Sequence, residues 1–262
     1  MNIKLKDKRA IVCGSTQGIG KAIALELALL GASVTLVARN EEKLQKVLDE
    51  LPLKEGQAHH YICADFDEPD RLKTALDQYL IKECNVHILI NNTGGPPAGK
   101  AIEARLDAFD VAFKRHLICN HILVQAVTPS MKQAGYGRII NIISTSVKSP
   151  LPGLGVSNTI RGAVANWSKT LAYELAGYGI TVNNVLPGAT STLRLENIIN
   201  NKAAKSNKSV EEVTQMMKKE IPARRFATPE EVAAAAVFLA TPAAAYINGI
   251  NLPVDGGRLS CL

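Results

Sequence analysis

The chain of 262 residues contains no apolar run that approaches the roughly 18 residues needed for a membrane-spanning helix. Its first residues lack both the apolar segment and the small-residue cleavage site of a secretory signal peptide. We therefore expect a cytoplasmic protein that has no membrane as a partner.

Cysteine is scarce, and its five residues form neither a CxxC pair nor a Cys/His metal pattern. They are Cys13, Cys63, Cys84, Cys119 and Cys261. An odd number of widely spaced cysteines indicates neither a disulfide framework nor a zinc site. We expect free thiols in a reducing compartment, and no bound metal.

Aromatic residues make up only 5% of the chain and do not interleave with basic ones, as they do in many nucleic-acid-binding surfaces. The net charge is +6, but the basic residues are scattered among acids, as in the segment 202–219. Solvated helix faces explain this balance, so we expect no nucleic-acid partner.

Short apolar segments instead alternate with longer helical patterns along the whole chain. Strands are predicted at 10–13, 33–37, 60–64, 87–90, 138–143, 181–186 and 251–254, and helices near 18–30, 41–51, 69–82, 107–133, 156–177 and 229–240. The strands are apolar on both faces, as in a parallel sheet covered by helices on each side. This order predicts an α/β protein with a single doubly wound parallel sheet, a Rossmann fold.

A glycine-rich segment lies between the first predicted strand and helix. It consists of Gly14, Ser15, Thr16, Gln17, Gly18, Ile19 and Gly20. Glycines at such a turn let the backbone approach a pyrophosphate, which the N–H groups of the next helix bind. The spacing is G-x3-G-x-G rather than the commoner G-x-G-x-x-G, and turns also collect glycine for structural reasons. Its position nevertheless predicts dinucleotide binding.

The residue after the second strand, Arg39, indicates which dinucleotide is bound. An acid at this place binds the ribose 2′-hydroxyl of NAD, whereas an arginine accommodates the 2′-phosphate of NADP. The alternative is a solvent-exposed arginine at a helix start, with Asn40 as the helix N-cap. We predict NADP(H) in preference to NAD(H).

No linker divides the chain, so residues 1–262 are predicted to form one NAD(P)-binding Rossmann domain. The stretch 189–226 interrupts the strand–helix alternation before the last helix. A long irregular excursion at that place is interpreted as a substrate lid rather than a second domain.

Over essentially its whole length the chain resembles the short-chain dehydrogenase/reductase family. The glycine segment matches the family's cofactor motif, and Asp65 matches its adenine-contacting aspartate. Residues 91–94, which include Asn92, Thr93 and Gly94, match the family's Asn-Asn-Ala-Gly, with Thr93 in place of the alanine. Pro187, Gly188 and Thr192 match the motif that meets the nicotinamide carboxamide. Segments 226–232 and 246–257 resemble the ending of the 3-oxoacyl-[acyl-carrier-protein] reductase branch.

The resemblance implies catalysis by a serine, a tyrosine 13 residues later and a lysine four residues after that. The serine position holds Ser144, but the tyrosine position holds Ser157 and the lysine position holds Arg161. The family's relay asparagine corresponds to His116. An aliphatic hydroxyl is a far weaker acid than a phenol, so the usual proton donor is missing.

Each substituted position also has a structural interpretation. Ser144 could satisfy local backbone groups, Ser157 could be a helix N-cap, and His116 could be a core histidine. Arg161 stays protonated, could stabilise a developing oxyanion and could bond the cofactor ribose. If it is buried, it needs a polar or anionic partner, which the ribose or a substrate carboxylate or phosphate would supply.

The leading prediction is an NADP(H)-dependent oxidoreductase that reduces a ketone, an aldehyde or a 3-oxoacyl thioester, or oxidises the corresponding alcohol. Its proton would come from His116 or water. The alternative is a weakly active or inactive NADP(H)-binding sensor or assembly protein. The resemblance also implies a homotetramer or homodimer. Lysines of the 189–226 segment could attract an acidic acyl carrier protein, although solvated helix faces explain them equally well.

Overall fold

In the computed structural model, which describes residues 1–54, 56–83 and 85–261, seven parallel strands form one sheet in the order β3-β2-β1-β4-β5-β6-β7. The strands are β1 (Arg9–Cys13), β2 (Ser33–Ala38), β3 (His60–Cys63), β4 (Ile88–Asn91), β5 (Gly137–Ile142), β6 (Ile180–Pro187) and β7 (Asn251–Val254). Each lies within one residue of its predicted bounds. The strand order reverses between β1 and β4, and ligands of doubly wound sheets bind at that switch point.

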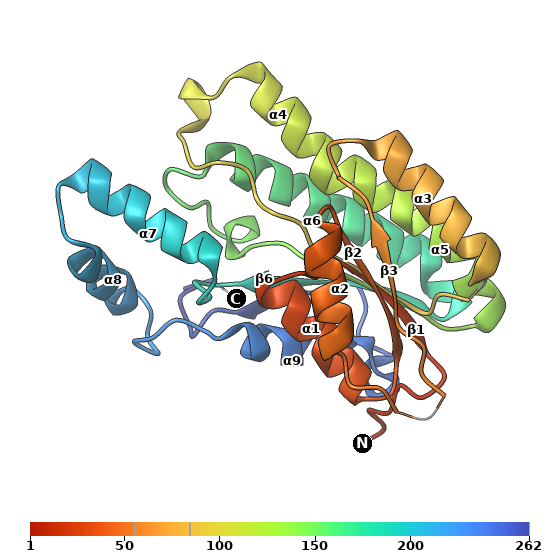
Figure 1. Ribbon diagram of the computed structural model, residues 1–262. Coiled ribbons are helices and arrows are strands. Elements are labelled where there is room, and N and C mark those ends of the chain that lie inside the picture. Colours follow the sequence, from red (N-terminus) through yellow and green to blue (C-terminus); the bar gives the residue numbers. More distant parts are fainter. Residues whose placement is uncertain (55, 84, 262) are drawn as a thin grey trace.

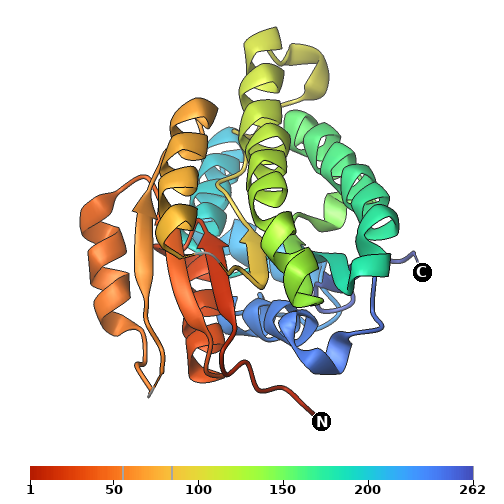
Figure 2. The ribbon, with the colours of Figure 1, turned by 90° about the vertical axis from the view of Figure 1, so that its right-hand side faces the viewer.

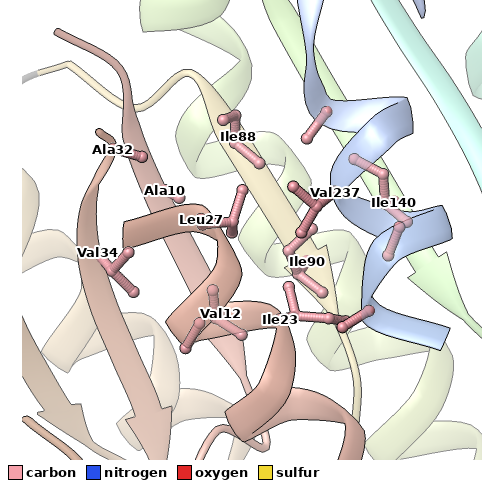
Figure 3. Close-up of a cluster of buried hydrophobic side chains, with 14 of the residues drawn as sticks. Ala10, Val12, Ile23, Leu27, Ala32, Val34, Ile88, Ile90, Ile140 and Val237 are labelled. Carbon is pink, nitrogen blue, oxygen red and sulfur yellow. The ribbon is translucent and has the colours of Figure 1, made fainter. Parts of the chain in front are cut away.

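Helices cover both faces of the sheet, as predicted (Figures 1 and 2). On one face lie α1 (Gly18–Leu29), α2 (Glu41–Glu50) and α9 (Pro229–Ala240). Ile23 and Leu27 of α1 meet Val237 of α9 over the strands, in the larger of the apolar clusters (Figure 3). The other face is covered by α3 (Pro69–Lys82), α5 (Cys119–Ala134) and α6 (Gly155–Leu175). No helix in the described ranges is long and apolar enough to cross a bilayer.

The single helix predicted at 107–133 is wrong in detail. The structure has α4 (Leu106–Phe113), a π-helical turn η2 (Lys114–Ile118) and then α5. Turns of this kind are often found at functional sites, because they place one side chain out of the ordinary helical register. His116 lies in this turn, and α6 packs against the turn.

The segment 189–226 is also more regular than predicted, because it contains α7 (Leu193–Ser206) and α8 (Val210–Lys219). Thr192 caps α7, and Ser209 with Glu212 forms a capping box on α8. The two helices share a small apolar cluster of their own and stand at the left of Figure 1.

A ladder of four asparagines, three of them buried, joins the second half of the sheet. Asn91, Asn141, Asn184 and Asn251 lie at aligned positions of β4, β5, β6 and β7. Each Nδ2 donates to the next Oδ1, at 2.8, 3.0 and 2.8 Å, and Asn141 also donates to Ser168 Oγ of α6. The ladder therefore fixes the register of β4, β5, β6 and β7, whose carboxyl ends carry part of the site.

Candidate active site

The glycine segment connects β1 to α1 and leaves the start of that helix free to bind an anion. Gln17, the N-cap residue, makes no side-chain hydrogen bond to the first turn, and the first turn contains no acidic residue. Unsatisfied N–H groups at the positive end of a helix are suited to a phosphate. This geometry fits a dinucleotide pyrophosphate.

Two of the glycines are required by their surroundings. A Cβ on Gly20 would lie 2.2 Å from the carbonyl oxygen of Gly14, so α1 can start this close to β1 only with glycine. Gly18 has a φ of +54°, in the left-handed region, and a Cβ there would lie 3.1 Å from Thr192 Cγ2. Thr192, predicted to contact the cofactor, therefore stands directly over the glycine segment.

The other predicted cofactor residues line the same edge of the sheet. Asn92 Nδ2 donates to the carbonyl oxygens of Cys13 and Gly14, at 3.2 and 3.3 Å, so it ties the loop after β4, where Thr93 and Gly94 follow, to the glycine segment. Pro187 ends β6, and the N–H of Gly188 donates to Val254. Ser15 is buried, whereas Thr16 and Ile19 are half-buried.

Arg39 and Asp65 follow β2 and β3, with 3.8 Å between Nη1 and Oδ2. The Arg39 side chain is 71% exposed, which leaves its guanidinium accessible to a phosphate. Asn40 is the N-cap of α2 and accepts a hydrogen bond from Lys43, as predicted. The two candidate adenosine-binding residues thus lie together at the first half of the sheet.

Ser144 follows β5 and begins the short 3₁₀ turn η3 (Thr145–Val147), where its Oγ accepts from the N–H of Ser146 at 3.1 Å. This hydrogen bond is the local backbone contact that the structural interpretation of Ser144 predicted. A hydroxyl that accepts one hydrogen bond keeps its own proton to donate. Ser144 can therefore cap the turn and also donate to a substrate oxygen.

Arg161 is only 8% exposed and reaches from α6 to the end of β5, where Nη1 donates to the carbonyl oxygen of Ile142 at 2.9 Å. Burial, and then the charge of Arg194, lower the pKa of Arg161 to about 10. The residue is still a cation at neutral pH.

Ser157 is 6% exposed and lies in the first turn of α6, four residues before Arg161. The N-cap interpretation of Ser157 is wrong, because the N-cap position is occupied by Leu154. Its hydroxyl has no hydrogen bond to any residue that the structure describes.

His116 is 2% exposed, and its Nε2 atom has no hydrogen-bond partner in the described part of the chain. Burial lowers its pKa to about 2, helped by the charges of Arg161, Arg115 and Arg194 and opposed by a backbone hydrogen bond with Gly94. The prediction that His116 could supply the proton needs correction, because a charged imidazolium is strongly disfavoured here near neutral pH. With its other nitrogen hydrogen-bonded to Gly94, the neutral imidazole can accept a hydrogen bond through Nε2.

Arg194, in the first turn of α7, was missed from the sequence. Its Nη1 and Nη2 donate to the carbonyl oxygens of Gly95 and Pro96, at 2.9 and 3.0 Å, and so join α7 to the loop after β4. The signal that could have revealed it is a cation at the positive end of a helix, where its charge is unfavourable. That signal was hidden because no helix was predicted there.

Within the described residues, no three or more His, Cys, Asp or Glu side chains are grouped so that they could hold a metal ion. Cys13, Cys63, Cys119 and Cys261 are free thiols, and Cys84 lies outside the described residues.

Comparison with known proteins shows similarity along nearly the whole chain. Residues 14–258 match the family model described as Enoyl-(Acyl carrier protein) reductase. The 3-oxoacyl-[acyl-carrier-protein] reductase of Synechocystis sp. is 35% identical, over 95% of this chain and 96% of its own. The NADPH-dependent reductase BacG of Bacillus subtilis is 29% identical, over 98% of this chain and 100% of its own. The L-sorbose reductase from Gluconobacter frateurii, solved with NADPH and L-sorbose, superposes with a TM-score of 0.93 at 29% identity, with 100% of each chain covered.

Proposed function

Because the chain belongs to the short-chain dehydrogenase/reductase family, we propose that it is an NADP(H)-dependent oxidoreductase acting on a small-molecule ketone, aldehyde or corresponding alcohol. One observation carries the enzymatic role. The buried guanidinium of Arg161 is held against the carbonyl oxygen of Ile142, two residues before Ser144. A buried cation beside a hydroxyl donor is the arrangement that a developing oxyanion requires.

The choice of cofactor rests on the glycine segment and on Arg39. An exposed guanidinium at the end of β2 can form two parallel hydrogen bonds to a 2′-phosphate, which NAD lacks. Thr192 and Gly188 would hold the nicotinamide end at the carboxyl edge of β6. NADPH, when bound, would supply the hydride to the carbonyl carbon.

The chain's own residues would handle the carbonyl oxygen. The Ser144 hydroxyl donates a hydrogen bond to it, and Arg161 stabilises the negative charge that develops as the hydride arrives. A proton then reaches the alkoxide from water, which Nε2 of the neutral His116 imidazole can hold in place by accepting a hydrogen bond from it. Ser157 at most orients this water, because its hydroxyl is too weak an acid to protonate the oxygen itself.

A second candidate function is a cofactor-binding protein with little or no turnover. The positions of the six tyrosines favour it. Tyr61, Tyr79 and Tyr136 are hydrogen-bonded to Glu41, Thr35 and the carbonyl oxygen of Ala240, and Tyr173, Tyr178 and Tyr246 are exposed at the surface. None of these six tyrosines is therefore placed to act as the proton donor in place of the family's catalytic tyrosine.

The remaining organisation belongs to the same proposal. Residues 1–262 form one cofactor-binding domain in the cytoplasm, and α7 with α8 acts as a lid over the substrate. A homodimer or homotetramer would cover exposed apolar side chains near α4, namely Ile102, Leu106 and Phe113.

The experiment is a screen of NADPH oxidation against ketones, aldehydes and 3-oxoacyl thioesters, with the double variant Ser157→Tyr, Arg161→Lys assayed in parallel. We expect turnover by the wild type. If the wild type binds NADPH but turns over no substrate, while the double variant reduces one, the second candidate replaces the first.

A further inference from the structure

Two arginines of the site have no acidic partner. None of the ion pairs between described residues includes Arg161 or Arg194, whereas the neighbouring Arg115 is paired with Asp67. Arg161 is buried, and a buried cation without an anion is costly. The site therefore carries positive charge that the protein itself does not neutralise.

Arg194 and His116 contact consecutive residues of the loop after β4, and Arg161 lies close enough to act on His116. Arg194 lies on Gly95 and Pro96, His116 bonds the backbone of Gly94, and the charges of Arg161 and Arg194 both act on His116. A guanidinium has five N–H groups. Arg161 uses one and Arg194 uses two within the described chain, so most of these donors remain available to a ligand.

Two features of Arg194 and His116 indicate that they bind a ligand rather than play a purely structural role. Arg194 is the second residue of α7, where the helix dipole disfavours a cation and favours an anion. The second feature is independent of the first: Nε2 of His116 is buried without a partner, although buried polar atoms are nearly always hydrogen-bonded. An oxyanion between the arginines would offset their charge, and a hydroxyl or water that accompanies it could donate to Nε2 of this neutral imidazole, whose other nitrogen is hydrogen-bonded to the backbone of Gly94.

We propose that the substrate is an anionic carbonyl compound, whose carboxylate or phosphate group binds to Arg194 with Arg161 and His116 beside it. The inference rests on the proposed function and gives its substrate class. Arg194 is thus a specificity-determining residue, while Arg161 also faces the carbonyl oxygen. The competing source of negative charge is the pyrophosphate of the cofactor, and the test separates the two.

Gly95 offers a way to move the Arg194 head group without removing it. A Cβ on Gly95 would lie 2.7 Å from Nη2 and 2.8 Å from Cζ of Arg194, so Gly95→Ala must displace the guanidinium. Gly99 lies in the same loop and has open space around its own Cβ direction. Gly99→Ala is therefore the matched control.

The test uses matched probes with and without the charge: 4-methyl-2-oxopentanoate and its methyl ester, and dihydroxyacetone phosphate and dihydroxyacetone. Calorimetry of the NADP⁺-saturated protein measures binding without turnover, and NADPH oxidation measures kcat/KM. We expect at least about tenfold preference for one anion over its neutral analogue. Which pair shows the preference distinguishes a carboxylate from a phosphate.

Arg194→Gln and Gly95→Ala should abolish this preference and leave NADPH affinity unchanged, whereas Gly99→Ala should retain it. Arg194→Lys, which keeps the charge, should retain part of it, and this excludes misfolding as the cause. Equal binding of both members of both pairs would overturn the proposal. So would an Arg194→Gln variant that loses NADPH affinity but keeps the preference. Anion binding to the NADP⁺ complex without any turnover would support this site while contradicting the proposed enzymatic function.

Discussion

The guanidinium of Arg161 donates to the carbonyl oxygen of Ile142 at 2.9 Å, across from α6 to the end of β5. This contact fixes a buried cation next to the strand end that carries Ser144. The lysine expected at this position by family resemblance is replaced by a group that stays charged and is held by the protein backbone.

A buried cation without an anion should lower the stability of the cofactor-free protein. We predict that Arg161→Met, which keeps most of the volume and removes the charge, raises the free energy of unfolding by about 1 kcal/mol or more. Urea denaturation of the two cofactor-free proteins measures it. A less stable variant would mean that the Ile142 contact outweighs the cost of burial.

Arg39 should determine the preference between the two cofactors. We expect the wild type to bind NADPH at least about tenfold more tightly than NADH, or about 1.4 kcal/mol, through its contact with the 2′-phosphate. Arg39→Ala should remove that difference and leave NADH affinity unchanged. Fluorescence titration checks it, and equal affinities in the wild type would contradict the assignment.

The asparagine ladder should be a large source of stability. Asn141→Ala removes the acceptor of Asn91 and the donor to Asn184, and each unpaired buried group costs about 1–3 kcal/mol. We predict a loss of at least about 2 kcal/mol in the free energy of unfolding. The control is Asn166→Ala, at an exposed position of α6, which should change stability little. Equal losses in both variants would refute the role of the ladder.

Stability should also fall in acid because of His116. Its pKa is about 2 in the folded protein and 6.5 when unfolded, so below pH 6.5 only the unfolded chain takes up the proton. The free energy of unfolding is unaffected by this titration above pH 6.5, and at pH 5.5 it is lower by about 1.4 kcal/mol. His87, with a pKa of about 4, adds a similar loss. His116→Asn should therefore lose less stability than the wild type between pH 7.5 and 5.5, and identical losses would contradict the assignment.

The sheet and the glycine segment were predictable because their signals are local. Strands apolar on both faces, such as β4 and β5, and a glycine cluster between β1 and α1 can be recognised from adjacent residues. The π-helical turn at Lys114–Ile118 was not predictable from local residues. The helical sequence pattern continues through it without a break, and its contact with α6 joins segments that are distant in the sequence.

The role of Arg194 was hidden for a related reason. Its partners Gly95 and Pro96 lie 99 and 98 residues away in sequence, so no local pattern joins them. The charge state of His116 likewise depends on burial and on three arginines from other parts of the site. Motifs thus sufficed to predict that the candidate cofactor residues follow β1, β2, β3, β4 and β6, whereas the surroundings of the catalytic candidates required the folded structure.

The central claim is that Arg161 stabilises the oxyanion in place of the usual tyrosine and lysine. The most direct test is kcat/KM of Arg161→Ala, measured with and without added guanidinium ion at concentrations that leave the wild type folded. We predict a fall of about a hundredfold or more, with partial recovery when guanidinium is supplied and none with methylammonium. Unchanged kcat/KM in Arg161→Ala would contradict the account.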